Sequence, residues 1–414
     1  MASTAVRAES LSLAEARARV RAAVRPLPAG EVPLAEALGL ALAADVRAPH
    51  ALPPFRNSSM DGFAVRAAEA GAWLPVRETL AAGSAAERPL GPGEAARIMT
   101  GAPLPPGADA VVPFEEAEES EAGSPPRMRA RGAEAPAANV RDAGADLAAG
   151  AVVLAAGRTL SPHDLGLCAA LGVTRVPVGG VPRVGVVSTG DELLEPSQPL
   201  APGRIRDSNR PMLELLLREA GARVVSSVHA PDDPAEVEAA IRAALAAADV
   251  VLTIGGVSAG DFDPVKQSLG AIGGIALWRV AMKPGRPQAF GAPGGRLFFG
   301  LPGNPASVAC VFEVLARPAI LALAGHREVG RPMLDVRAAE RVESRAGRTD
   351  FVRATLARRE GEWWATPAGA QVSGHLTPQS RAHALVEIPE AAEALERGDA
   401  ARAFVLRWPE RDAG

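Results

Sequence analysis

The sequence predicts a multidomain α/β protein built around a doubly wound parallel sheet. Between residues 179 and 327, short apolar runs alternate with loops and helical segments, which is the pattern of repeated β–loop–α units. The pattern changes on both sides of this region. Residues 48–139 are rich in proline and glycine, and residues 328–414 lose helical periodicity, so we expect additional β-rich parts.

Composition sets broad limits on function. At about 100–200 residues per domain, 414 residues allow two to four domains. The net charge of −4 argues against a general nucleic-acid or membrane-surface role, so any anion site must be local. The two cysteines, Cys168 and Cys310, lie in apolar helical surroundings, and we expect buried free thiols. The histidines are scattered without an HExxH pair, which argues against a zinc site.

The N-terminal region has helix signals and no signal-peptide pattern. Ser12 and Glu15 have the spacing of a capping box, and charges occur throughout the segment that follows. Ser161 and Pro162 have the pattern of a helix cap and first helical residue. No apolar run approaches the ~20 residues needed to cross a bilayer, so we expect a cytoplasmic protein without membrane contact.

These signals predict a domain plan and an order of elements. The predicted domains are a helical linking domain (1–47 and 140–178), an inserted β-rich module (48–139), an α/β sheet domain (179–327) and a small C-terminal β-barrel (328–414). Strands of the sheet are expected at Val184–Ser188, Arg223–Val228, Val250–Ile254 and Leu297–Gly300, with an extended segment near Leu277–Ala281. Helices are expected around Pro211–Ala220, after Pro234, after Pro264 and from Ala306.

The loop after the strand Val250–Ile254 is the most informative segment. The apolar run breaks at Gly255 and Gly256, where the backbone can turn sharply and approach a ligand closely. Asp261 and Asp263 follow, and Pro264 opens a helix. Ligands of open α/β sheets bind at such strand ends, and carboxylates there suit a divalent cation that bridges to phosphate. The loop therefore suggests magnesium-assisted chemistry on a phosphorylated ligand.

Two further strand ends carry carboxylates. Glu192 follows the first strand, and Asp232 and Asp233 precede Pro234 after the second. An aspartate before a proline is a good helix cap, and capping alone explains either of the two Asp–Pro loops. Three acidic loops at one sheet edge favour a shared cation site instead, and capping does not explain Glu192.

Basic and proline-rich segments complete this edge. Arg279 and Lys283 are four residues apart, so in an extended segment they share a face and could converge on one phosphate, with Arg286 beyond a turn. A solvated edge strand is the alternative interpretation. Pro302 and Pro305 stiffen a strand–helix loop whose helix start is expected to present free backbone N–H groups to a ligand.

The remaining candidates are ambiguous from the residues alone. Asp61 and Thr100 lie in two polar segments of the inserted module that end in glycine turns, and Asp146 lies just after that module. Each of them could belong to an ordinary turn.

Taken together and in order, the motifs resemble the molybdopterin molybdenumtransferase family, which includes MoeA-like proteins and the C-terminal domain of gephyrin. The matching strings span residues 57–376 and are NSSMDGFAV, IMTGAPLPPGADAVV, STGDEL, APDDP, GGVSAGDFD, MKPGRP, LPGNPAS and QVSGHL. The resemblance implies a molybdopterin-binding, Mog-like sheet domain. It also implies magnesium-dependent insertion of molybdate into adenylylated molybdopterin with release of AMP.

The resemblance also implies site residues and partners. Catalytic positions fall on Asp61, Thr100, Asp146, Glu192, Asp232 and Asp263, of which Glu192, Asp232 and Asp263 would hold magnesium. Substrate-binding positions fall on Gly255, Gly256, Ser258, Arg279, Lys283, Arg286, Pro302, Pro305 and Ser373. The family is typically a homodimer with a cleft between the sheet domain of one subunit and the inserted module of the other. A molybdopterin adenylyltransferase and cofactor-accepting molybdoenzymes are the expected partners.

The sequence departs from the family pattern at a few positions, and two alternatives stay open. Arg279 and Arg286 stand where many members have lysine, Pro264 replaces a common tyrosine, and Thr377-Pro378 stands where a serine pair is usual. A molybdopterin adenylyltransferase shares the sheet but is usually a single small domain. A non-catalytic scaffold of the gephyrin kind is the other alternative, but the acidic and basic residues retained at the catalytic positions argue against it. The absence of GxGxxG after a strand and of a Gly-Lys-Ser/Thr motif disfavours dehydrogenases and P-loop enzymes.

Overall fold

The structure is a computed structural model that describes residues 8–122, 124–257 and 264–410. The chain forms two compact units, each described here by itself. The first comprises Met1–Ala44, Ala156–Ser161 and Pro177–Gly414, and the second comprises Asp45–Ala155 and Pro162–Val176. The proposed division into four domains is finer than these two units and stays a prediction.

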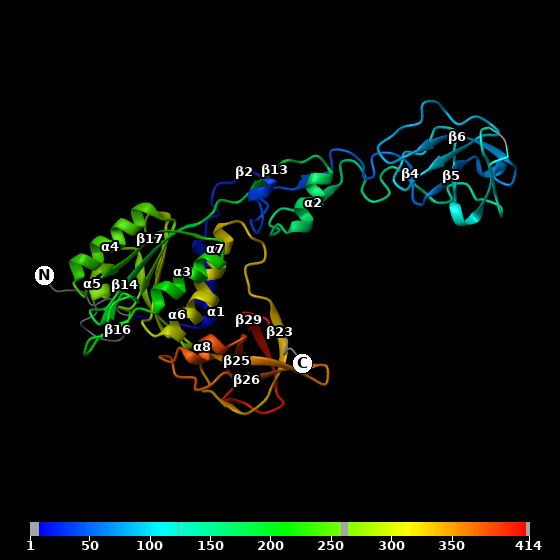
Figure 1. Ribbon diagram of the computed structural model, residues 1–414. Helices are drawn as coiled ribbons and strands as arrows, with labels where there is room; N and C mark the ends of the chain where they lie inside the picture. Colours follow the sequence, from blue (N-terminus) through cyan, green and yellow to red (C-terminus); the bar gives the residue numbers. More distant parts are fainter. Residues whose placement is uncertain (1–7, 123, 258–263, 411–414) are drawn as a thin grey trace. The chain divides into compact units, whose positions relative to one another are not determined.

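The first unit contains the predicted sheet, with helices on both faces (Figure 1). Its seven strands run in the order β1 (Glu9–Leu11), β19 (Ile275–Val280), β21 (Pro287–Gly291), β22 (Leu297–Leu301), β18 (Val250–Ile254), β14 (Arg183–Thr189) and β17 (Arg223–Ala230). β22, β18, β14 and β17 are mutually parallel, as predicted, but β21 is antiparallel to both of its neighbours. The α/β fold class is confirmed, and the sheet is mixed rather than wholly parallel.

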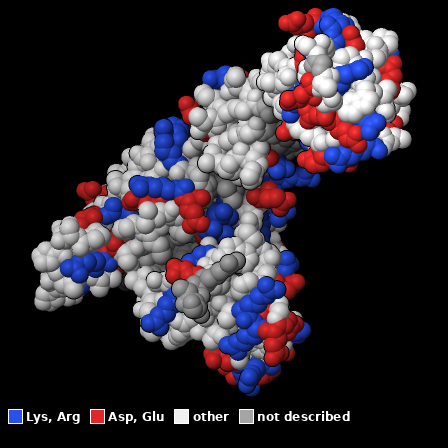
Figure 2. Space-filling view, turned by 45° about the vertical axis from the view of Figure 1, so that its right-hand side comes forward, with Lys and Arg blue, Asp and Glu red and all other residues white. Residues whose placement is uncertain are grey.

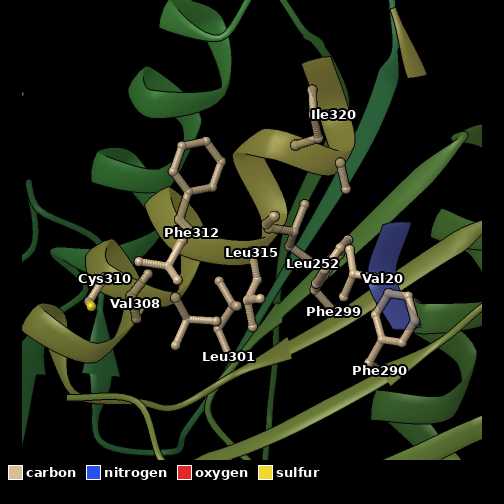
Figure 3. Packing of buried hydrophobic residues seen from close by; sticks show 14 of the residues in the cluster. Val20, Leu252, Phe290, Phe299, Leu301, Val308, Cys310, Phe312, Leu315 and Ile320 are labelled. Carbon is tan, nitrogen blue, oxygen red and sulfur yellow. The ribbon is translucent and has the colours of Figure 1, made fainter. Parts of the chain in front are cut away.

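Alternating residues of the strands face two separate helix layers. One layer consists of α1 (Leu13–Ala23), α3 (Asn209–Glu219) and a continuous helix formed by α6 (Pro305–Val311), a π-turn (Phe312–Ala316) and α7 (Arg317–Leu323). The other consists of α4 (Pro234–Ala247) and α5 (Pro264–Ile272). In β18, Leu252 packs against the first layer and Val251 against the second, which is the period-two pattern of a strand buried on both faces. Figure 3 shows Phe312, Leu315 and Ile320 of the long helix over Leu252, Phe299 and Leu301 of the strands.

The expectation about apolar runs is wrong, and the expectation about the cysteines is confirmed. The stretch Pro305–Leu323 has 19 residues and is apolar enough to cross a membrane by length and composition, contrary to the expectation that no such run exists. It is 83 % buried against the rest of the unit, so it serves as a core helix in this fold. Cys310 on this helix and Cys168 are both buried free thiols, as predicted, and burial raises the pKa of each.

The end of the first unit is a closed β-barrel, which confirms the predicted C-terminal barrel. Its strands follow the order β25 (Thr349–Arg359), β26 (Glu362–Pro367), β23 (Met333–Ala338), β29 (Ala400–Val405) and β27 (Ala384–Ile388), and β27 pairs back with β25. β20 (Met282–Lys283), which follows the sheet strand β19, pairs in parallel with β25 and so ties the barrel to the sheet. The barrel also carries α8 (Thr377–Arg381) and the short pair β24 (Val342–Glu343) and β28 (Ala394–Leu395).

The second unit has a six-stranded sheet of its own. The order is β8 (Ala110–Pro113), β5 (Gly62–Val65), β7 (Ala95–Ile98), β6 (Leu74–Leu80), β10 (Arg127–Ala130) and β9 (Ala117–Ser120). The unit also contains the strand pairs β4 (Asn57–Ser58) with β11 (Val140–Arg141) and β3 (Val46–Arg47) with β12 (Val152–Leu154), and the helix α2 (Pro162–Ala170). The predicted β-rich character of residues 48–139 is therefore observed, and α2 begins at Pro162 as its cap pattern predicted.

The N-terminal region is less helical than expected. The Ser12–Glu15 capping box is present and α1 follows it, but α1 packs into the core of the sheet. Residues 30–36 form the strand β2 (Gly30–Pro33) and a 3₁₀ turn (Leu34–Glu36) instead of a second helix. Pro33 and the positive φ of Gly39 (77°) explain this difference, because both interrupt a helical backbone.

Candidate functional site

Loops from three parallel strands meet at the carboxyl edge of the sheet. The amide of Gly255, after β18, donates to the carbonyl of Leu301 at the end of β22 (3.0 Å). A methyl group on Gly255 would lie 3.0 Å from Oγ1 of Thr189, the last residue of β14. The φ of Gly255 is 92°, a conformation that favours glycine. Gly255 therefore allows these loops to approach each other closely, while its predicted close approach to a ligand stays a prediction.

Asp232 and its neighbour Asp233 have different tasks. Asp233 caps α4, because its Oδ1 accepts hydrogen bonds from the amides of Ala235 (2.9 Å) and Glu236 (3.0 Å). Asp232 takes no part in this cap. Its amide donates to Oδ1 of Asp191 (3.1 Å), and its own Oδ2 accepts from the amide of Asp191 (3.2 Å). The helix cap therefore accounts for Asp233 alone and leaves Asp232 at the sheet edge for another task.

Glu192 lies over the backbone of the turn that precedes it. A methyl group on Gly190 would come within 2.6 Å of Oε2 of Glu192, so a larger residue there would require this exposed side chain to move. The φ of Gly190 is 141°. After Glu192 the chain forms the short strand β15 (Leu193–Leu194), which pairs with β16 (Ile205–Arg206), and no helix begins there. The prediction that Glu192 is not a helix cap is therefore confirmed.

The carboxylates suit a hard divalent cation. Magnesium prefers oxygen ligands and is commonly held by one or two carboxylates together with water and substrate phosphates. Glu192 and Asp232 offer such oxygens on the loops after adjacent strands, β14 and β17. Within the described ranges, no group of three or more metal-binding side chains occurs. Asp263, the third predicted ligand, and Ser258 lie outside the described residues.

Two polar residues at the start of α3 were missed from the sequence. Asn209 Nδ2 donates to the carbonyl of Gly303 (2.6 Å), and its Oδ1 is buried without a hydrogen-bond partner among the described residues. Asp207 is 3 % exposed and accepts from the amide of Arg210 (3.0 Å). The sequence pattern that could have identified these two residues is the polar run Asp-Ser-Asn directly before an apolar helix. Asn209 adds a hydrogen-bonding group next to the loop of Pro302 and Pro305.

The loop between β22 and α6 contacts the barrel. Nδ2 of Asn304 donates to Oγ of Ser373 (3.1 Å), so the structure brings Ser373 next to the loop of Pro302 and Pro305. The expectation of free amides at the start of α6 is wrong. The amide of Ala306 donates to the carbonyl of Ser373 (3.0 Å), that of Ser307 donates to Asn304 (2.9 Å), and proline at 305 has none.

Arg353 of β25 holds the loop that carries Ser373. The guanidinium donates to three main-chain carbonyls of this loop, those of Ala370, Val372 and His375, over 3.0–3.3 Å. Arg353 is 2 % exposed. An arginine between the apolar neighbours Val352 and Ala354 was the sequence signal for this buried residue.

The two predicted phosphate-binding cations do not share one strand face. The extended segment is interrupted at Ala281, so that Arg279 lies in β19 of the sheet and Lys283 in β20 at the barrel. Nζ of Lys283 lies 3.8 Å from Oδ2 of the buried Asp350. Arg279 instead lines a groove with Arg286. Lys283 thus contacts the barrel, and the predicted convergence of Arg279 and Lys283 on one phosphate stays a prediction.

Asp61 and Thr100 form a pair within the second unit. Oδ1 of Asp61 accepts hydrogen bonds from the amide (2.7 Å) and the hydroxyl (2.8 Å) of Thr100. These two bonds, that of the amide first, hold the pKa of Asp61 below its usual value. Asp146, also in this unit, is exposed, and its amide donates to the carbonyl of Leu52 (3.0 Å). The two sequence segments of Asp61 and Thr100, ambiguous alone, therefore form one polar cluster.

Comparisons with known proteins cover nearly the whole chain. Residues 11–172 match the MoeA N-terminal region (domain I and II), residues 185–322 match a probable molybdopterin binding domain, and residues 335–406 match the MoeA C-terminal region (domain IV). The protein named molybdopterin molybdenumtransferase 2 of Mycobacterium tuberculosis is 40 % identical over 386 residues, which are 90 % of this chain and 93 % of that relative. The chain belongs to the molybdopterin molybdenumtransferase (MoeA) family.

Other MoeA-family proteins agree with this assignment. Molybdopterin molybdenumtransferase of Bacillus subtilis is 35 % identical, with 91 % of each chain covered. The crystal structure of a molybdopterin biosynthesis MoeA protein from Pyrococcus horikoshii superposes with a TM-score of 0.83 at 30 % identity, covering 97 % of this chain and 100 % of that one. The resemblance and the fold class are thereby confirmed. The roles of individual residues in this MoeA-family chain stay predictions.

Proposed function

We propose that this protein is a transferase that inserts molybdate into adenylylated molybdopterin, with magnesium as cofactor and AMP as a product. Family membership over nearly the full chain supports the transferase activity. The observation that carries the finer proposal is the carboxylate pair at the sheet edge, where Asp232 is set apart from the capping residue Asp233. Carboxylates at this edge suit a cation that accompanies a pyrophosphate link.

In this proposal, Glu192 and Asp232 hold the magnesium ion, with Asp263 as the third predicted ligand. When bound, magnesium neutralises charge on the phosphate oxygens and stabilises the AMP that leaves. The reciprocal hydrogen bonds with Asp191 fix the backbone that carries Asp232, so little reorganisation is needed on binding.

The remaining predicted residues bind and orient the substrate. Arg279, Lys283 and Arg286 supply positive charge for phosphate or molybdate oxygens. Gly255 and Gly256 let the loop after β18 approach the ligand closely. Ser373 and the loop of Pro302 and Pro305 support this arrangement through the contact between Asn304 and Ser373.

The test compares two adjacent aspartates. The full chain is incubated with adenylylated molybdopterin, molybdate and magnesium, and AMP release is measured for Asp232→Asn and for Asp233→Asn. Asparagine caps helices about as well as aspartate, so Asp233→Asn should keep its rate within about twofold. Asp232→Asn should lose at least about tenfold, because a cation ligand loses its charge. The proposed activity is refuted if the wild-type protein releases no AMP. The proposed role of Asp232 is refuted if both variants keep the wild-type rate.

We further propose that the working protein is a homodimer in which Asp61 and Thr100 of one subunit complete the site of the other. Mixing Asp61→Asn with Asp232→Asn subunits tests this. A site shared across the dimer leaves one intact site in each mixed dimer, so random exchange should restore about a quarter of the wild-type rate. If both residues act within one subunit, no activity returns. The same proposal includes the predicted cytoplasmic location. It also includes two kinds of partner, an adenylyltransferase that supplies the substrate and molybdoenzymes that accept the product.

A further inference from the structure

A cavity in the first unit lies between the helix layer of α1 and the barrel. It has a volume of about 710 Å³ and is lined by α1, by the long helix that ends with α7, by the connecting segment 326–332 and by the barrel strands β27 and β29. Cavities of this size commonly hold small organic ligands. None of the predicted site residues that the structure describes lines it, so it is not part of the proposed substrate site.

The cavity has an excess of positive charge. Five arginines but only two glutamates line it. Arg331 is neutralised by Glu313 through two hydrogen bonds of 2.8 Å each. Within the described ranges no carboxylate forms an ion pair with the other four arginines, which are Arg17, Arg21, Arg327 and Arg402. Over the face drawn in Figure 2, by contrast, basic and acidic side chains are interspersed. Four unpaired cations around one cavity favour an anion inside it.

Arg17 of α1 shows this imbalance most clearly. Its side chain is partly buried, and in the part of the chain that the structure describes it makes neither a hydrogen bond nor an ion pair. Burial lowers the pKa of Arg17, and the charge of Glu387 in β27 opposes this effect. A partly buried guanidinium group without a partner is unfavourable, and a bound carboxylate would supply two oxygens for its paired N–H groups.

The wall between the arginines is apolar. Val20, Leu315 and Ala319 line it and belong to the main core of the unit, in which Figure 3 labels the first two. Phe404 of β29 packs against the same core, and its ring centroid lies 5.9 Å from that of Phe351. The wall is therefore fixed by packing before a ligand arrives and suits a hydrocarbon body.

The cavity extends away from the proposed substrate site. β1, β19 and β22 are parallel, so α1 and α6, which follow β1 and β22, begin at the carboxyl edge of the sheet and run back towards its amino edge. At about 1.5 Å per residue, Ala322 near the end of α7 lies roughly 25 Å along the helix from Pro305. Ala322 and Val24 line the cavity at the ends of their helices. A small ligand at this end cannot contact the loops of the carboxyl edge.

We propose that this cavity binds a small amphipathic carboxylate, with its apolar body along α1 and Phe404 and its carboxylate at Arg17 and Arg402. The planar guanidinium fork matches the two oxygens of a carboxylate. Burial of the apolar body against the wall supplies the remaining affinity. The inference goes beyond the proposed function and does not depend on it.

The experiment titrates the full chain with octanoate, acetate and 1-octanol by isothermal titration calorimetry. Octanoate has a carboxylate and an apolar body, whereas acetate lacks the body and 1-octanol lacks the charge. We expect one octanoate to bind per wild-type chain with a Kd of about 1 mM or tighter, and the other two compounds to bind at least about tenfold more weakly. The double variant Arg17→Gln/Arg402→Gln should weaken octanoate binding at least about tenfold and leave 1-octanol binding within about twofold.

The matched control is Arg19→Gln/Arg341→Gln. It also removes one charge from α1 and one from the barrel region, but Arg19 pairs with Glu9 (2.7 Å) and Arg341 with Glu343 (3.1 Å), and neither arginine lines the cavity. This control should bind octanoate within about twofold of wild type.

A third variant, Ala322→Phe, places a ring on the apolar wall and should weaken octanoate and 1-octanol alike. The arginine variants decide the question even if Ala322→Phe lowers the melting temperature. The inference is overturned if wild type does not bind octanoate in this range, or if the two double variants weaken binding equally. Binding of several octanoate molecules per chain, unchanged by the cavity variants, would show association with the surface and would also overturn it.

Discussion

Replacing Glu313 by glutamine should destabilise the first unit strongly. Glu313 lies in the π-turn, its side chain is 4 % exposed, and its carboxylate makes a two-pronged ion pair with Arg331, at 2.8 Å for each oxygen. Arg331 is 10 % exposed and belongs to the segment that connects the long helix to the barrel. Oε2 of Glu313 also lies 3.9 Å from Nε of Arg317. Glutamine keeps the shape of the side chain but removes its charge, which leaves the largely buried Arg317 without this carboxylate and Arg331 with only the exposed Glu219 as its partner.

Removing one partner of a buried pair costs about 3–5 kcal/mol, which lowers the melting temperature of a unit of this size by roughly 10 °C. Glu219→Gln is the matched control, because Glu219 pairs with the same Arg331 at 2.6 Å but is 52 % exposed. Its loss should cost less than about 1 kcal/mol. Thermal and urea unfolding, followed by tryptophan fluorescence, measure both. Equal destabilisation by the two variants would show that burial does not determine the strength of these pairs and would refute the reasoning.

Three further substitutions test the site. Thr100→Val removes one of the two hydrogen bonds that depress the pKa of Asp61, so this pKa should rise in a carboxyl-carbon NMR titration. A carboxyl group with a depressed pKa stabilises the folded state at pH values above its unfolded pKa, and this stabilisation is lost as the pH falls through its folded pKa, so in the variant it should be lost at a higher pH than in wild type. An unchanged titration of Asp61 would contradict this reasoning. Gly190→Ala puts a side chain at a backbone position whose φ is 141° and within 2.6 Å of Oε2 of Glu192, so the turn or the carboxylate must move and AMP release should fall at least about tenfold; a wild-type rate would show that the reaction does not depend on the geometry of this turn. Arg353→Lys removes the guanidinium group whose hydrogen bonds hold the loop after β26, so limited proteolysis should cut that loop faster, while circular dichroism should show an unchanged fold. Equal cutting rates would argue that Arg353 does not hold this loop.

The sequence predicted best what depends on local patterns. Continuous apolar runs such as Val250–Ile254 are typical of strands buried on both faces, and the structure has β18 at those residues. Proline and capping residues predicted the starts of α2 and α4 for the same reason, because they act within one helical turn.

Features that depend on distant pairing were not predicted. β1 has three residues and β21 begins at a proline, so neither has a periodic pattern, and their places in the sheet come from partners far along the chain. The pairing of Lys283 with Asp350 in the barrel likewise separates Lys283 from Arg279. At the site, the sequence predicted the cap at Asp233, which directly precedes Pro234, but it did not predict the reciprocal hydrogen bonds of Asp232 with Asp191, which lies on another loop.

The place of β1 has a consequence for how the chain folds during synthesis. Glu9 lies opposite Trp278, so β1 is made well before its partner β19 and must wait for it. At about 5–20 residues per second this delay is on the order of tens of seconds. The strands of the second unit all come from residues 46–154, so this unit can fold during the interval. β1 is thus made before the second unit but takes its place in the sheet only after that unit has had time to fold, and a chaperone that protects the unpaired β1 has that interval in which to act.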